Sequence, residues 1–134
     1  MMSNPPSDVV LVIEDHEDIR EGIRIVLMLD GYTVAVAANG REALAKLYAG
    51  LRPRLIIMDL MMPVMNGFEF RQVQLADPDL ANIRLIAYSG ITDPRETALQ
   101  LHADAYMHKP TDMESMAALV RQFCPKDTVP ESRP

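Results

Sequence analysis

The sequence predicts an α/β fold, a doubly wound parallel sheet of five strands with helices on both faces. Short apolar runs rich in β-branched residues alternate about five times with segments whose apolar residues recur at helical spacing. The runs at 9–13 and 55–59 are apolar almost throughout, which is typical of strands buried on both faces. The connections are too short for anything but right-handed crossovers, so neighbouring strands are expected to be parallel.

Each element has its own local signal. Apolar runs predict strands over residues 9–13, 33–37, 55–59, 83–88 and 105–108. A first helix is expected over 19–30, because Gly31 supplies a stop signal there. The other helices are expected to begin at four N-cap pairs: Asn39 with Glu42, Asn66 with Glu69, Asp93 with Glu96, and Thr111 with Glu114.

Length and composition indicate one globular domain. The 134 residues are 49% hydrophobic and 24% charged, which is ordinary for a folded domain with its own core. We expect a flexible leader over 1–7, the domain over 8–124 and a flexible tail over 125–134, because both ends are polar and contain prolines. Neither end is long enough for an output domain, so a stand-alone domain is expected.

Charge and residue usage exclude several classes of partner. The net charge of −6 and the scattered basic residues argue against direct nucleic-acid binding. Cys124 is the only cysteine, so no internal disulfide can form and a reducing compartment is the simplest assumption. No apolar run is long enough to cross a bilayer, and no secretion signal precedes the first strand. A cytoplasmic protein without membrane contact is expected.

Polar side chains that could act together follow four of the predicted strands. They are Glu14 and Asp15, Asp59, Ser89 and Lys109. In parallel sheets of this kind, ligands bind beyond the carboxyl ends of the strands, so these groups are expected to converge. Turn chemistry explains each residue singly, and it does not explain why all four loops carry a compatible set.

This set of side chains indicates phosphoryl chemistry. Three carboxylates that lie close together repel one another and need a cation. Oxygen ligands without histidine or cysteine favour Mg²⁺. Lys109 and Ser89 can contact anionic oxygens, and Asp59, at the end of the central strand, is the candidate nucleophile.

At this point the sequence resembles the receiver domains of two-component response regulators. The matching pieces are Glu14-Asp15, the run from Asp59 to Pro63 with Gly67 following, Ser89, and Tyr106 ahead of Lys109-Pro110. The resemblance implies a flavodoxin-like fold with strand order 2-1-3-4-5, which is the order that this family has. It covers nearly the whole chain.

The resemblance also implies a role for each site residue. Asp59 would take a phosphoryl group from a phosphohistidine on a histidine kinase or a phosphotransfer protein. Asp15, Asp59 and the Met61 carbonyl would bind Mg²⁺, and Glu14 would act through water. Ser89 and Lys109 would bind phosphoryl oxygens, and Ser89 with Tyr106 would form a switch toward a downstream protein partner. Such a domain accepts a phosphoryl group and is not a turnover enzyme.

Some positions depart from the family pattern. His102 stands where glycine is frequent, so the fourth helix is expected to end differently, and Thr111 is expected to cap the last helix. In receiver domains, the positions that Met61 and Ile91 occupy lie beside the path of the attacking water. Neither of these two side chains can hold water by a strong hydrogen bond. Slow self-dephosphorylation is therefore predicted, although both residues could simply pack.

Two other interpretations remain open from the sequence. The chain could be the receiver portion of a larger hybrid kinase or regulator, or a receiver-like module that binds partners without phosphorylation. The intact acids and Lys109 weigh against the second interpretation. An enzyme of another class is weaker still, because Ser89 lacks the G-x-S-x-G elbow of serine hydrolases.

Overall fold

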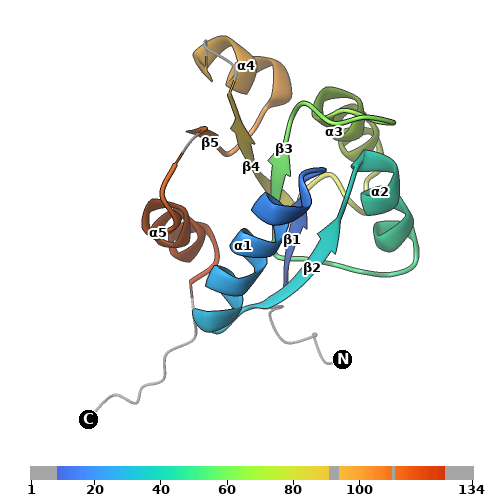
Figure 1. The fold of residues 1–134 in the computed structure, drawn as a ribbon. Coiled ribbons are helices and arrows are strands. Elements are labelled where there is room, and N and C mark those ends of the chain that lie inside the picture. Colours follow the sequence, from blue (N-terminus) through green and yellow to red (C-terminus); the bar gives the residue numbers. More distant parts are fainter. Residues whose placement is uncertain (1–8, 91–93, 110, 126–134) are drawn as a thin grey trace.

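Five parallel strands form a single sheet in the computed structural model, which describes residues 9–90, 94–109 and 111–125 (Figure 1). The strands are β1 (Val9–Ile13), β2 (Thr33–Ala37), β3 (Leu55–Asp59), β4 (Arg84–Ser89) and β5 (Ala105–His108). Their order is β2-β1-β3-β4-β5, and every neighbouring pair is parallel. The predicted fold and strand order are confirmed. The predicted leader, nearly all of the tail and the Asp93 cap lie outside the described residues.

The sheet is covered on both faces because side chains alternate along each strand. Five helices follow the strands: α1 (Glu17–Leu29), α2 (Gly40–Tyr48), α3 (Gly67–Ala76), α4 (Pro94–Leu101) and α5 (Met113–Phe123). Leu11 and Ile13 of β1 face α2, α3 and α4, whereas Val10 and Val12 face α1 and α5. All five residues of β3 are buried, which makes it the central strand of both cores.

The helix starts follow the predicted caps in two of the described cases. Asn66 accepts a hydrogen bond from the Glu69 amide at 2.9 Å, and the Glu69 carboxylate accepts one from the Asn66 amide at 3.0 Å. Asn39 likewise accepts from the Glu42 amide at 2.9 Å. These contacts satisfy amides that a helix start leaves without partners.

The prediction that Thr111 caps the last helix is wrong. Helix α5 begins one residue later than expected, and Asp112 is its N-cap, accepting from the Ser115 amide at 2.7 Å. Threonine and aspartate are both good N-cap residues, so the local pattern did not separate them.

Two backbone positions shape the ends of helices near the site. A Cβ on Gly67 would lie 2.7 Å from Leu60 Cδ2, so only glycine lets α3 start this close to the end of β3. His102, directly after α4, has a φ of 53°. This left-handed conformation costs about 1 kcal/mol for a residue with a Cβ. His102 thus keeps a left-handed conformation at a position where glycine is frequent in the family. Among the described residues, no helix is long and apolar enough to span a membrane.

Candidate functional site at the carboxyl edge of the sheet

The predicted site residues meet at the carboxyl edge of the sheet. Glu14 and Asp15 follow β1, and Asp59 is the last residue of β3. The register pairs Ile13 with Met58, so these two parallel strands end at the same level. Ser89 ends β4, and Lys109 follows β5 directly. The sheet therefore gathers side chains that lie up to 95 positions apart in sequence.

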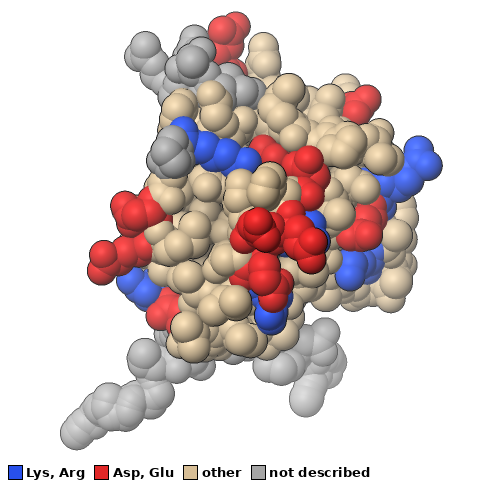
Figure 2. Space-filling view, in the orientation of Figure 1, with Lys and Arg blue, Asp and Glu red and all other residues tan. Residues whose placement is uncertain are grey.

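Three carboxylates form a cluster that could hold a cation. One oxygen from each of Glu14, Asp15 and Asp59 lies within 4.8 Å of the others. Glu14 and Asp59 are buried, with 1% and 5% of their surfaces exposed, whereas Asp15 is exposed. Acidic side chains also gather where α1 begins, the region seen near the middle of Figure 2. The cluster offers only oxygen ligands and one open side, which suits a hard divalent ion.

Glu14 is held in place by backbone contacts on both sides. Its amide donates to the Ala37 carbonyl at 3.0 Å, and its Oε2 accepts from the His16 amide at 3.0 Å. Arg20 Nη1 donates to the Glu14 carbonyl at 2.9 Å. These contacts fix the turn between β1 and α1 and leave Oε1 facing the site.

The Lys109 amine bridges two of the acids. Its Nζ lies 3.1 Å from Glu14 Oε1 and 3.4 Å from Asp59 Oδ2. Its backbone amide donates to the Ser89 carbonyl at 2.8 Å, and its amine lies 5.0 Å from the centre of the Tyr88 ring. Burial lowers the pKa of Lys109, but the hydrogen bond to Glu14 and the two acidic charges outweigh it and raise the pKa. The amine is therefore a fixed positive charge at the site.

Asp59 is the acid most perturbed by its surroundings. Burial and the Glu14 charge raise its pKa to about 6, although Lys109 and the Met61 amide oppose the shift. The Met61 amide donates to Asp59 Oδ1 at 3.3 Å. Lys109 and the Met61 amide thus do not fully compensate the ionised carboxylate of Asp59, and a bound cation would stabilise it further.

The two switch candidates are linked through the backbone of β4. Ser89 is buried, and the Tyr106 hydroxyl lies 3.4 Å from the Ser89 carbonyl. Burial raises the pKa of Tyr106, so its hydroxyl stays protonated and can donate. The side chain of Met61 is 64% exposed beside the site, and Ile91 lies outside the described residues.

Sequence reasoning missed two neighbours of the site. Arg20 reaches the Glu14 carbonyl from within α1, and no motif indicates that contact. Tyr88 lies opposite Asp59 in the register of β3 and β4. The sequence signal for it is its position directly before Ser89, the polar end of β4.

Comparisons with known proteins agree with this geometry. Residues 10–121 match the family model of the response regulator receiver domain. Response regulator MprA of Mycolicibacterium vanbaalenii is 38% identical over 128 residues, which cover 92% of this chain and 54% of that protein. The chain spans about half the length of the curated relatives it matches.

Solved structures with similar folds come from several bacteria. The signal receiver domain of a signal transduction histidine kinase from Syntrophus aciditrophicus is 31% identical, with a TM-score of 0.79. That match covers 90% of this chain and 94% of the other. Response regulator TrrA of Thermotoga maritima, solved in complex with Mg²⁺ and BeF, is 27% identical with a TM-score of 0.75. It covers 86% of this chain and 97% of the other.

Proposed function

Because the chain belongs to the response regulator receiver domain family, we propose that Asp59 accepts the phosphoryl group of a phosphohistidine. The donor is a histidine kinase or a histidine phosphotransfer protein, since receiver domains partner with histidine kinases in two-component signalling. One observation carries the proposal: the carboxylates that end β1 and β3 lie together, and the Lys109 amine bridges two of them. A receiver is a phosphoacceptor rather than a turnover enzyme.

The donor set fits Mg²⁺. The three carboxylates offer hard oxygen ligands, and burial together with the Glu14 charge raises the pKa of Asp59, a shift that a bound cation would oppose. Asp15, Asp59 and the Met61 carbonyl would hold the ion, and Glu14 would act on it through water. When bound, it would neutralise charge on the transferring phosphoryl group. The relative TrrA was solved with Mg²⁺ and BeF, which supports the same chemistry in this chain.

In the proposed transfer, an Asp59 oxygen attacks the phosphorus of the phosphohistidine. A P–O bond forms as the P–N bond breaks, and the imidazole nitrogen keeps the electron pair and takes up a proton. Lys109 would stabilise negative charge on the phosphoryl oxygens, and Ser89 would donate a hydrogen bond to one of them. Because attack requires the ionised carboxylate, the positive charges of Lys109 and of a bound cation would also favour the reactive form of Asp59.

Signalling would follow from the contact between Ser89 and Tyr106. A Ser89 side chain drawn toward the phosphoryl group would change the space beside Tyr106, which contacts the Ser89 carbonyl in the unphosphorylated protein. The phosphorylated form would then favour a different packing of α4, β5 and α5, and a downstream protein would bind that form.

Intact mass spectrometry after incubation with acetyl phosphate and Mg²⁺ tests the proposal. The expected result is one added phosphoryl group that is absent from Asp59→Asn and absent when EDTA removes the ion. Asp18→Asn, which removes an exposed acid on α1, is the matched control and should be labelled like the parent protein. Labelling of Asp59→Asn, or no labelling of the parent by acetyl phosphate and several histidine kinases, contradicts the proposal.

One of the two alternatives predicts a different result. A phosphorylation-independent interaction module would bind its partner equally well as the parent protein and as Asp59→Asn. The receiver portion of a larger kinase or regulator would be labelled as proposed here. Receivers occur in such a context among the similar proteins: MprA is about twice as long as the match, and the Syntrophus domain belongs to a histidine kinase.

A further inference from the structure

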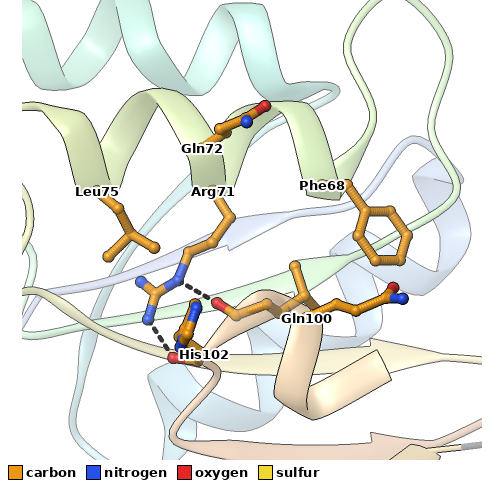
Figure 3. Close-up of a pocket in the computed structure, with 7 residues that line it drawn as sticks. Phe68, Arg71, Gln72, Leu75, Gln100 and His102 are labelled. Atoms are coloured by element: carbon orange, nitrogen blue, oxygen red, sulfur yellow. Dashed lines mark hydrogen bonds between the residues drawn. The ribbon is translucent and has the colours of Figure 1, made fainter. Parts of the chain in front are cut away.

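A buried arginine in α3 points at the end of α4, away from the phosphoacceptor site. Arg71 lies in the first half of α3 and is only 5% exposed. Figure 3 shows its guanidinium extending from α3 toward the segment around His102. A buried charge is costly unless polar groups compensate it, so its surroundings should reveal what it does.

The guanidinium binds the carbonyls that end α4. Arg71 Nε donates to the Leu101 carbonyl at 3.0 Å, and Nη2 donates to the His102 carbonyl at 2.6 Å (Figure 3). The last carbonyls of a helix lack partners within the helix and carry its partial negative charge. No carboxylate of the described residues lies within 4 Å of the Arg71 nitrogens. The end of α4 is therefore the direct counter-charge of Arg71, with Asp104 acting from further away.

Gln74 holds the guanidinium in this orientation. Its Oε1 accepts from Arg71 Nη1 at 2.8 Å, and its Nε2 donates to the carbonyls of Leu80 and Ile83 at 2.9 and 3.0 Å. Gln74 is fully buried. The pair thus joins α3 both to the connection before β4 and to the end of α4.

Hydrogen bonds add to apolar packing where the end of α4 meets α3, since Leu101 is buried in the same core cluster as Phe70. A cavity of about 370 Å³ lies between the two helices, bordered by Phe68, Leu75 and Leu101 as well as Arg71. The residue that Arg71 binds, His102, has a left-handed backbone, which costs more for a residue with a Cβ than for glycine. The bonds from Arg71 offset that cost.

The end of α4 leads directly into the strand that carries the switch. Asp104, two residues after His102, exchanges hydrogen bonds with Leu85: its amide donates at 2.9 Å and its carboxylate accepts at 2.8 Å. Strand β5 begins at Ala105 and contains Tyr106. A displacement at His102 would therefore shift the start of β5.

We propose that Arg71 is a positioning residue that fixes the end of α4 and the start of β5 against α3. In doing so it sets how readily α4, β5 and α5, which surround Tyr106, change their packing. The part that concerns phosphorylation rests on the proposed function, whereas the positioning part does not. Arg71 contacts neither the phosphoacceptor nor the predicted metal ligands, so its influence on the site is indirect.

Hydrogen exchange of Arg71→Met tests the positioning part without any phosphoryl group. Losing two bonds from a charged donor should speed exchange of the amides over 102–107 about tenfold or more, with little change in β1. Arg24→Met, which removes a partly exposed guanidinium of α1, is the matched control and should leave 102–107 unchanged. Equal acceleration throughout the sheet, or none at 102–107, would overturn the proposal.

A second substitution separates positioning from plain loss of stability. His102→Gly removes the backbone strain, so it should restore more protection over 102–107 in Arg71→Met than it adds to the parent protein. Should Arg71→Met fail to fold, Arg71→Lys serves instead, because it keeps the charge and loses the paired donors. Additive effects of the two substitutions would overturn the inference that Arg71 supports His102.

The link to phosphorylation has its own readout. In the parent protein, labelling Asp59 with acetyl phosphate should change exchange over 102–107, and the change should be smaller in Arg71→Met, where that segment is already loosened. Equal changes in both proteins would overturn this link. If the parent protein takes no phosphoryl group, the proposed function fails, yet the exchange of unphosphorylated proteins still decides the role of Arg71.

Discussion

Replacing Asp59 by asparagine should stabilise the unphosphorylated protein at neutral pH. The pKa of Asp59 is raised to about 6 by burial and by the Glu14 charge, from an ordinary 3.8. The folded protein therefore holds this proton more tightly than the unfolded chain does. As pH rises from about 4 to about 6, unfolding releases that proton, and the free energy of unfolding falls.

The size of the effect follows from the same difference. Two pH units correspond to about 3 kcal/mol, which is the largest cost that the ionised Asp59 can impose above pH 6. An asparagine at this position carries no charge at any of these pH values. Asp59→Asn should therefore match the parent protein near pH 4 and exceed its stability by about 2 to 3 kcal/mol at pH 7.5.

Urea unfolding from pH 4 to 8 in EDTA measures this difference directly. Asp15→Asn, which removes the exposed acid of the cluster, is the matched control. Its difference from the parent should stay within about 0.5 kcal/mol across the range, because it is a surface substitution. A stability difference for Asp59→Asn that does not vary with pH would refute the reasoning. So would an asparagine variant that is less stable at pH 7.5.

Three further predictions concern neighbouring positions. Gly67→Ala should destabilise the protein by about 1–3 kcal/mol in urea unfolding because its Cβ meets atoms at the end of β3, whereas Gly22→Ala in α1, with nothing within 4 Å, should stabilise it by up to about 1 kcal/mol. Asn66→Ala should cost about 1 kcal/mol in the same assay by removing the α3 cap, and an unchanged midpoint would contradict this. Met61→Asn with Ile91→Glu should shorten the lifetime of phosphorylated protein in a mass-spectrometric time course, and an unchanged lifetime would count against slow self-dephosphorylation.

The strands and the strand-end acids could be predicted from the sequence because their signals are local. The β3 run is apolar up to Asp59, and parallel strands must end at the same edge, so Glu14, Asp15 and Asp59 had to lie together. The capping box at Asn66 involves residues only three positions apart. Such signals depend on spacing along the chain and on general rules for sheets, which a sequence contains in full.

Contacts between particular atoms of distant segments could be decided only by the tertiary structure. The sequence predicts that Lys109 and Glu14 share one edge of the sheet, but only the structure shows the amine 3.1 Å from Glu14 Oε1. No sequence rule indicates that Arg71 reaches Leu101 across 30 positions. The raised pKa of Asp59 likewise depends on burial and on the distance to Glu14. A charged residue in a helix is expected to be solvated until the packing shows what surrounds it. Arg71 is surrounded by the carbonyl end of another helix, and because a buried charge must be compensated, that contact holds the two helices together.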